Sequence, residues 1–527
     1  MLRRMSSLVI VFAFLFSVLI AQIFSVNTNP LYLRAGVSQS SYTVTAGGTN
    51  ANIYDSNMCR LTNTQTEYIA VINPTADAVE KTLPFVKDME RFARGIKSEK
   101  PFTCRVSCRN IASSDAVVFE IPQRLSYNQT AQHIIGYTVD GVGVTGLEKA
   151  CDSFLRSVRN ESFVTFSVDN KGCVIDGSER KISDAETMRA GVVSTIDSRI
   201  QLIAEAAMKN IKKGAAIVSD VRTGELRAVV SVPSYNANRL DEALESSDSP
   251  LINRAFCAYG AGSVFKLVIA AAALENGFPE GFEHNCTGST EINDRVFKCH
   301  KEDGHGMLDM EGAIKCSCNP YFIQLSEYLD SEQLYNTAAK FGFGTQCILA
   351  DTIVSASGRL TDKEELEIAA EKANFSFGQG VLTVTPLQIS MLTCAIANNG
   401  DMPIASLIKG ITSDGISIKN QSKARYAKTI KPETAELLRS FMLSAVDGSP
   451  SSNARSEKVK IAGKTSTAQT GRYDEDGNEL CHGWITGFFP YESPQYAVTV
   501  LAEDGGTGNL IAAPVLRKIA EEIVTLE

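Results

Sequence analysis

The chain begins with its most hydrophobic segment. After two arginines close to the N-terminus, apolar residues run from Leu8 to Val26 with only three polar interruptions. About 20 such residues are enough to cross a bilayer as a helix. No small-x-small cleavage pattern follows, so we expect residues 1–30 to be a cytoplasmic N-terminus and an uncleaved transmembrane anchor, with the rest of the chain outside the cytoplasm. A cleaved signal peptide is the alternative.

Residues 31–185 show shorter and more mixed patterns of hydrophobic and polar positions. Strand-like runs occur at Tyr68 to Ile72, Ala116 to Ile121 and Phe163 to Val168, and polar loops separate them. We find no internal repeat and no low-complexity tract in this region. The patterns predict an α+β pedestal rather than an enzymatic domain.

The remaining residues, 186–527, include an Ala-rich, helix-forming run from Leu267 to Leu274. A chain of 527 residues is too long for a single core and fits an anchor followed by two domains. The formal net charge of −9, with an isoelectric point of about 5.4, argues against a nucleic-acid partner.

Ser263 and Lys266 place a hydroxyl and an amine three residues apart, directly before the helix-forming run. At this spacing two side chains share one helical face, so the amine can take the proton from the hydroxyl. The segment Tyr259-Gly260-Ala261-Gly262 provides a flexible approach to the start of the helix. A single Ser-x-x-Lys match is weak, because the pattern occurs by chance in chains of this length.

Two further motifs strengthen the interpretation. Ser317-Cys318-Asn319 lies in a short polar turn that opens another apolar run, and Lys464-Thr465-Ser466-Thr467 follows small residues and has the pattern of a strand at a sheet edge. A Ser-x-x-Lys, a Ser-x-Asn and a Lys-Thr segment, in this order, are the three elements of serine acyl transfer in penicillin-recognising enzymes.

With these motifs in place, the chain resembles a class B penicillin-binding protein, a membrane-anchored D,D-transpeptidase of bacterial peptidoglycan synthesis. The resemblance covers roughly residues 190–522. Family-like segments beyond the three motifs are Thr195-Ile196-Asp197, Asn253-Arg254-Ala255, Gly378-Gln379-Gly380 and Gly483-Trp484.

This resemblance implies an α/β (α+β) fold of the penicilloyl-serine transferase or β-lactamase-like type. A central antiparallel sheet would be sandwiched by helices, with the active site between the sheet and a helical lobe. Residues 186–527 would then form the transpeptidase domain, and residues 31–185 a pedestal or dimerisation-like domain. The Lys-Thr motif departs from the family at Ser466, where glycine is usual. We expect this serine to shift the strand modestly, and it leaves reduced or altered activity open.

The resemblance also implies roles for the catalytic residues. Ser263 would be the nucleophile and Lys266 its general base. The base must be an uncharged amine, and burial together with the positive charge of Lys464 would lower its pKa. Ser317 would relay the proton to the departing amine.

Four residues would bind the substrate. Asn319 would hold a substrate amide and orient the general base. Lys464 and Thr465 would bind the terminal carboxylate of the donor peptide. The backbone N–H of Thr467, with that of the nucleophile, would form the oxyanion hole.

The implied reaction is acylation of the serine by a D-Ala-D-Ala stem peptide, release of D-alanine and transfer of the acyl group to an amine of a neighbouring strand. β-Lactams would acylate the same serine. No metal and no organic cofactor is expected. A polytopic glycan-strand polymerase is the expected partner, acting in elongation, division or sporulation.

The alternatives are a D,D-carboxypeptidase with water as the acceptor and a catalytically weak cell-wall scaffold. A β-lactamase or a penicillin-sensing receptor is less favoured, because we find no deacylating carboxylate and no cytoplasmic domain.

The chain holds thirteen cysteines, and four of them, Cys286, Cys299, Cys316 and Cys318, gather around the second motif. The simplest interpretation is that they are reduced and buried as small hydrophobic residues. A disulfide such as Cys299 to Cys318 is a second interpretation. Zinc is a third, because His284 and His300 lie beside two of the cysteines, but Cys-x2-Cys pairs are absent.

Overall fold

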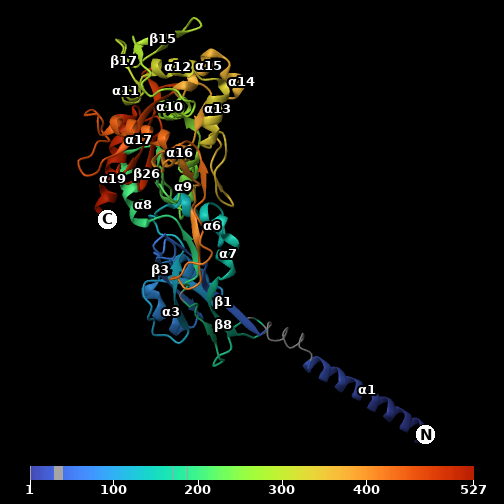
Figure 1. Cartoon of the computed structure of the whole chain (residues 1–527). Helices are drawn as coiled ribbons and strands as arrows, with labels where there is room; N and C mark the ends of the chain where they lie inside the picture. Colours follow the sequence, from blue (N-terminus) through green and yellow to red (C-terminus); the bar gives the residue numbers. More distant parts are fainter. Residues whose placement is uncertain (1, 29–39, 170, 172, 187, 527) are drawn as a thin grey trace. The chain divides into compact units, whose positions relative to one another are not determined.

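The computed structural model describes residues 2–28, 40–169, 171, 173–186 and 188–526. The chain divides into two compact units (Figure 1). The smaller unit comprises residues 1–50, 63–124 and 158–188, and the larger one comprises residues 51–62, 125–157 and 189–527. The boundaries expected from the sequence, at residues 30 and 185, stay a prediction. The two units differ from them because residues 51–62 and 125–157 pack with the larger unit.

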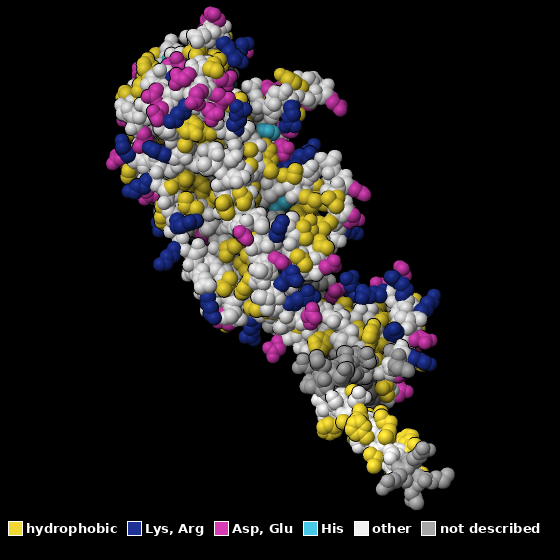
Figure 2. Space-filling view, turned by 90° about the vertical axis from the view of Figure 1, so that its right-hand side faces the viewer, with side chains coloured by type: hydrophobic (Ala, Val, Ile, Leu, Met, Phe, Trp, Pro, Cys, Tyr) yellow, Lys and Arg dark blue, Asp and Glu magenta, His cyan; other side chains and the backbone are white. Residues whose placement is uncertain are grey.

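The N-terminal helix α1 (Leu2–Thr28) contains one segment, Met5–Thr28, that is long and apolar enough to cross a membrane. Its hydrophobic side chains are exposed, with Leu8, Ile10 and Phe14 each more than half accessible. Figure 2 shows these side chains as a hydrophobic surface on α1. The helix is compatible with the single-pass anchor expected from the sequence.

The smaller unit contains two three-stranded antiparallel sheets. All three strands predicted in this region are present, within β3, β5 and β8. Apolar side chains of β1, β3, β5 and β8 share one core. The strand orders are β4 (Phe102–Val106), β3 (Gln65–Ile72), β5 (Ala116–Gln123) and β1 (Ser41–Thr49), β8 (Asn160–Ser167), β9 (Lys181–Ser183), and the helices are α3 (Ala76–Thr82) and α4 (Met89–Lys97).

The larger unit is built on a five-stranded sheet in which every neighbouring pair is antiparallel. Alternate residues of a strand point to opposite faces. In accordance with this, Ala215 and Ile217 pack with the core that contains α10, α16 and α17, whereas Ala216 and Val218 pack with α8 and α19. The predicted sandwich is confirmed. The sheet order is β12 (Leu226–Val232), β11 (Gly214–Asp220), β26 (Tyr496–Ala502), β25 (Glu479–Phe489), β24 (Ala462–Tyr473), and the covering helices are α8 (Ser198–Ala207), α10 (Lys266–Glu275), α16 (Pro386–Ala397), α17 (Pro432–Val446) and α19 (Ala513–Leu526).

A helical lobe adjoins this sheet and carries small β hairpins at its rim (Figure 1). Its central helix, α10, is buried from Lys266 to Ala273, and all residues of α16 are buried. A helix that is apolar on every side is stable only inside a core. The other elements of the lobe are β14 (His284–Cys286), β15 (Ser289–Ile292), β16 (Arg295–Lys298), β17 (Gly306–Leu308), α11 (Met310–Lys315), α12 (Asn319–Glu327), α13 (Ser331–Lys340), α14 (Lys363–Leu366) and α15 (Ala369–Ser376).

Short elements complete the larger unit. The strands are β2 (Asn52–Tyr54), β6 (Thr138–Val139), β7 (Val142–Gly143), β10 (Gly191–Ser194), β13 (Tyr259–Gly260), β18 (Ile348–Ala350), β19 (Ile353–Val354), β20 (Thr383–Val384), β21 (Asp401–Pro403), β22 (Ile408–Thr412) and β23 (Tyr426–Lys428). The helices are α5 (Gln132–Ile135), α6 (Gly146–Ala150), α7 (Asp152–Ser157), α9 (Leu240–Glu245) and α18 (Gly508–Ile511).

Candidate active site

Ser263 lies in a single 3₁₀ turn, Gly262–Phe265, that leads directly into α10. Gly262 precedes it with a φ of +57°, a conformation that L side chains rarely adopt. The turn places the Ser263 Oγ 3.0 Å from the Nζ of Lys266, the first residue of α10. The hydroxyl and the amine therefore meet as their spacing in the sequence predicts.

Ser317 and Asn319 reach the same amine from the turn between α11 and α12. Ser317 has a φ of +58°, which is unusual for a residue other than glycine and is found in strained turns at functional sites. Asn319 is the first residue of α12. The Lys266 Nζ lies 2.7 Å from the Ser317 carbonyl oxygen and 2.6 Å from the Asn319 Oδ1.

The third motif lies on β24, the edge strand of the sheet, as predicted. The Lys464 Nζ is 3.0 Å from the Ser317 Oγ and 2.9 Å from the Thr465 carbonyl oxygen. The Ser317 hydroxyl is thus shared, because it also lies 3.3 Å from the Lys266 Nζ. One hydroxyl connects two lysines that are far apart in the sequence.

A cleft of about 760 Å³ opens where the three motifs meet. Ser263, Ser317, Asn319, Lys464, Thr465 and Thr467 all line it, whereas Lys266 lies beneath Ser263 and is fully buried. All seven residues selected from the sequence are therefore brought together. Other polar lining residues were not selected from the sequence as catalytic or substrate-binding: Lys298, His300, Lys315, Gln379, Ser449, Ser451, Ser452, Gln469, Thr507 and Asn509. Of these, Gln379 lies in the family-like Gly-Gln-Gly segment, and His300 was considered only as a neighbour of the cysteines.

Burial of the two lysines controls the electrostatics of the site. Lys266 and Lys464 are 0% and 2% exposed. Burial, followed by the charge of Lys464, holds the pKa of Lys266 well below the value of a free lysine. Burial also lowers the pKa of Lys464, to about 8. The pKa of the amine beside Ser263 is thus shifted in the direction of its neutral form, whereas the pKa of Lys464, about 8, favours its charged form around pH 7.

The surroundings of the Lys266 amine fit the neutral form. A neutral amine has two N–H groups and one lone pair. The two shortest contacts, to the Ser317 carbonyl oxygen and the Asn319 Oδ1, involve oxygens that can only accept hydrogen bonds. In the charged form the amine also donates to the Ser263 Oγ, 3.0 Å away. In the neutral form the two shorter contacts use both N–H groups, and the lone pair is left for the Ser263 hydroxyl. This is the arrangement that a general base requires.

Ser466, which departs from the family pattern, is buried and donates a hydrogen bond of 3.0 Å from its Oγ to the Ala261 carbonyl oxygen. A Cβ built on Gly262 would lie 2.4 Å from this Oγ, so the glycine leaves room for the serine hydroxyl. β24 keeps an unbroken register with β25 from Ala462 to Gln469. The strand accommodates the serine without a bulge, and the serine connects it to the turn that carries Ser263.

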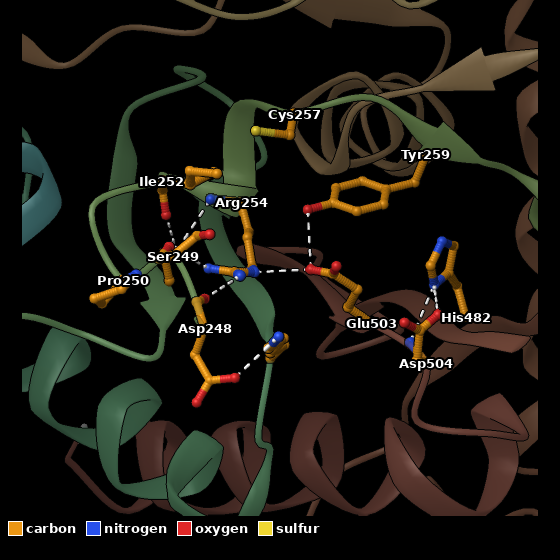
Figure 3. A network of polar contacts seen from close by, with 12 residues as sticks. Asp248, Ser249, Pro250, Ile252, Arg254, Cys257, Tyr259, His482, Glu503 and Asp504 are labelled. Carbon is orange, nitrogen blue, oxygen red and sulfur yellow. Dashed lines mark hydrogen bonds and ion pairs between the residues drawn. The ribbon is translucent and has the colours of Figure 1, made fainter. Parts of the chain in front are cut away.

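An ion pair between the buried Arg254 and the partly buried Glu503 supports the segment that leads to Ser263 (Figure 3). The Arg254 Nε donates to the Glu503 Oε2 at 2.7 Å, and its other guanidinium nitrogens donate to the carbonyl oxygens of Asp248 and Ser249. The Tyr259 hydroxyl approaches the same carboxylate at 3.5 Å. Because Tyr259 begins the approach to Ser263, this network connects the end of β26 to the loop before the catalytic turn.

All thirteen cysteines lie in the described part of the chain, and each is a free thiol. The disulfide considered between Cys299 and Cys318 is therefore not formed in this structure. These two residues nevertheless lie close together with Cys286 and His305. Of the histidines near the cysteines, it is His305, and not His284 or His300, that completes this group.

Comparison with known families gives a single consistent result. The family described as "Penicillin binding protein transpeptidase domain" matches residues 214–521, more than half of the chain. The chain belongs to this family. The resemblance to class B penicillin-binding proteins inferred from the motifs is confirmed, and residues 214–521 are hereafter the transpeptidase domain.

Several curated relatives cover most of the chain. It is 26% identical to the peptidoglycan D,D-transpeptidase MrdA of Acinetobacter baumannii, over 88% of this chain and 79% of the relative. It is 27% identical to the stage V sporulation protein D of Bacillus subtilis, over 87% and 72%. It is 28% identical to the peptidoglycan D,D-transpeptidase PbpA of Mycolicibacterium smegmatis, over 73% and 80%.

Solved structures share the fold. The D,D-transpeptidase domain of a peptidoglycan glycosyltransferase from Eggerthella lenta superposes with a TM-score of 0.67 at 21% identity, over 91% of this chain and 98% of that one. Penicillin-binding protein A of M. tuberculosis, solved as a penicillin G acyl-enzyme complex, gives 0.65 at 20% identity, over 90% and 99%. PBP2 of Helicobacter pylori, solved in complex with MreC, gives 0.68 at 22% identity, over 92% and 99%.

The ion pair under the approach loop leads to a prediction about stability. Replacing Arg254 with Met leaves the partly buried Glu503 carboxylate without its cation, and loss of one partner from a buried pair typically costs about 3–5 kcal/mol. We expect the R254M variant to unfold about 5 °C below the wild type in differential scanning calorimetry. The control is R239M, which removes an exposed arginine paired with Glu242 and should change the midpoint little. Equal midpoints for R254M and wild type would contradict the role assigned to the pair.

The hydroxyl of Ser466 leads to a prediction about catalysis. S466A keeps the Cβ but leaves the Ala261 carbonyl without its donor, a loss of about 1 kcal/mol. Because that carbonyl lies in the loop before Ser263, we expect acylation by a fluorescent penicillin to slow about fivefold in stopped-flow measurements. The control is S326A, which removes another buried hydroxyl bonded to a backbone carbonyl, within α12. An unchanged rate in S466A would show that the hydrogen bond does not position the nucleophile.

Proposed function

We propose that this chain is a peptidoglycan D,D-transpeptidase that uses Ser263 as its nucleophile. The observation that carries the proposal is the amine of Lys266, which is fully buried, uses both N–H groups on acceptors and faces the Ser263 hydroxyl at 3.0 Å. Membership in the transpeptidase family supports the reaction class. The names of the relatives support peptidoglycan as the substrate.

In the acylation step the Ser263 Oγ attacks the carbonyl carbon of the penultimate D-alanine in a stem peptide. Its proton moves to the neutral amine of Lys266, and a tetrahedral intermediate forms. The C–N bond to the terminal D-alanine then breaks. The proton passes from Lys266 to the departing nitrogen through the hydroxyl of Ser317, which contacts both lysines.

The same cleft supplies the groups that bind and orient the donor peptide. Lys464 has two of its three N–H groups on the Ser317 Oγ and the Thr465 carbonyl, so one remains for the terminal carboxylate. The Thr465 hydroxyl adds a second donor. Asn319 holds Lys266 through its Oδ1 and leaves its amide nitrogen, 3.5 Å from the Lys298 carbonyl oxygen, on the cleft side.

The oxyanion of the intermediate would be stabilised by the backbone N–H groups of Ser263 and Thr467, both of which line the cleft. Resolution of the acyl-enzyme by an amine of a neighbouring strand completes the cross-link. Hydrolysis of the acyl-enzyme by water would instead make the protein a D,D-carboxypeptidase. A β-lactam would form a long-lived acyl-enzyme at Ser263. No step of this scheme uses a metal or a cofactor.

The location of the protein follows from the anchor and the substrate. We infer that α1 spans the cell membrane once, with its N-terminus in the cytoplasm and the transpeptidase domain outside, where peptidoglycan lies. The region 31–185 would be the pedestal of the domain. A polytopic glycan-strand polymerase would be the partner, by resemblance to the family. PBP2 of Helicobacter pylori forms a complex with MreC, which supports a protein partner for this class of proteins.

Covalent labelling tests the nucleophile and the reaction. We expect the full chain in detergent to react with a fluorescent penicillin, and S263A to lose this labelling completely. With a pentapeptide donor and an amine acceptor, mass spectrometry should detect a cross-linked dimer and free D-alanine. Tetrapeptide without dimer would favour the carboxypeptidase, and an unlabelled wild type would favour the scaffold.

The two lysines predict the pH dependence of acylation. The rate should rise with pH as Lys266 loses its proton, with a midpoint well below that of a free lysine, because its pKa is lowered. It should fall again around pH 8 as Lys464 loses the charge that binds the carboxylate. In K464R the cation stays charged, so the alkaline decline should disappear while the acidic rise remains. An alkaline decline that persists in K464R would assign it to another group.

A further inference from the structure

Four metal-ligating side chains converge at the rim of the cleft. The thiols of Cys286, Cys299 and Cys318 and a ring nitrogen of His305 all lie within 4.8 Å of one another. The three cysteines are at most 4% exposed, and His305 is half-buried. Among the described residues this is the one group of three or more His, Cys, Asp or Glu side chains with such a geometry.

The distances fit a tetrahedral zinc ion. Zinc–sulfur bonds of about 2.3 Å and zinc–nitrogen bonds of about 2.0–2.1 Å place two ligand atoms of a tetrahedron about 3.6–3.8 Å apart. The Cys299 Sγ and the His305 Nδ1 are already 3.4 Å apart. A contraction of no more than about 1 Å brings the remaining ligand atoms to the same spacing. Three thiolates and one imidazole are a ligand set typical of closed, structural zinc sites.

The alternative interpretations account for less of the geometry. Cysteines that act only as small hydrophobic residues would have no reason to gather around a histidine nitrogen. A disulfide would use two of the four side chains and leave the third thiol and the imidazole without a role. The absence of Cys-x2-Cys pairs made zinc the least favoured interpretation of the sequence, but the four ligands come together from three separate segments: β14, the loop between β16 and β17, and the turn before α12.

The segment around the proposed ligands has too few buried side chains to form a hydrophobic core of its own. The rim lobe, residues 284–308, consists of the hairpin β15–β16 and a second two-stranded antiparallel sheet, formed by β14 and β17 on either side of it in the sequence. Its buried side chains are few, chiefly Phe297 and two of the cysteines, whereas Val296 and Met307 are about 60% exposed. A segment of this size rarely stabilises itself through a hydrophobic core and often depends on a metal or disulfide.

We propose that Cys286, Cys299, His305 and Cys318 bind one zinc ion, which fixes the rim lobe to the start of α12. Cys318 is the middle residue of Ser317-Cys318-Asn319, and both of its neighbours contact the Lys266 amine. The ion is held by four protein ligands and therefore offers no open position for substrate. Its function is to position Ser317 and Asn319 through the residue between them.

Metal analysis of the full chain tests the site directly. The protein is expressed with added zinc, purified in detergent without chelators and analysed by inductively coupled plasma mass spectrometry. We expect close to one zinc ion per chain in the wild type, and loss of this zinc in C318S and H305A. Replacement of zinc by cobalt should give the visible bands of tetrahedral Co²⁺ and thiolate-to-cobalt charge transfer. These spectra are recorded on the wild type, so the test does not depend on the folding of a variant.

Two controls separate the site from general effects. C316S removes a thiol two residues from Cys318 that is outside the group, and it should keep its zinc. S263A should also keep its zinc, so the metal result is independent of the proposed catalytic function. Two results would overturn the site. One is a wild type that was expressed with added zinc but contains no metal and gives no tetrahedral cobalt spectrum. The other is equal loss of zinc in C316S and C318S.

Acylation measures the positioning role. Removal of the ion with a chelator should slow labelling by a fluorescent penicillin about tenfold, the range found when groups that orient active-site ligands are lost. Addition of zinc should restore the rate. Labelling that is equally fast with and without the ion would overturn the positioning role.

Discussion

The burial of two lysine amines beside each other is the constraint on which the site depends. A buried ammonium is costly, and two within reach of one hydroxyl cannot both hold a full charge at low cost. The two amines differ in their surroundings. The deeper amine, that of Lys266, has two neutral acceptors from the α11–α12 turn, whereas Lys464 lines the cleft. The result is a lysine whose pKa is strongly lowered next to one that favours its charged form, which is the division of roles that the proposed acyl transfer requires.

The scaffold holds these groups on rigid elements. Lys266 begins a helix that is buried along nearly its whole length, and Lys464 lies on an edge strand whose other side is paired in register with β25. The third contributor, Ser317, is held in a left-handed turn, a conformation that costs energy and must be stabilised by its surroundings. Rigid supports on two sides and a strained turn on the third explain how three distant segments reach hydrogen-bonding distance of one another.

Much of this arrangement could be predicted from the sequence. The motifs carried the resemblance to class B penicillin-binding proteins that implied the fold, and hydrophobic periodicity predicted the strands of the smaller unit, because a motif or a strand is a local pattern. Three features could not be predicted in this way. The partner of the Ser466 hydroxyl is a backbone carbonyl, which has no signature in the sequence. Residues such as Gln469 and Asn509 line the cleft only because β24 and α18 meet there. The return of residues 51–62 and 125–157 to the larger unit depends on contacts between distant segments.

The relation between Ser466 and Gly262 shows how a departure from a family pattern can be compensated. Glycine is usual on this strand because the backbone approaches its neighbours closely. In this chain the added hydroxyl occupies space that a side chain at Gly262 would fill, and it satisfies a carbonyl of the adjacent loop. Where the family usually has close backbone packing at a glycine of the strand, this chain has a hydrogen bond from the Ser466 hydroxyl across the gap to the Ala261 carbonyl. Because the gap separates the turn that carries Ser263 from the strand that carries Lys464, this hydrogen bond is one of the contacts that set the relative position of the two elements.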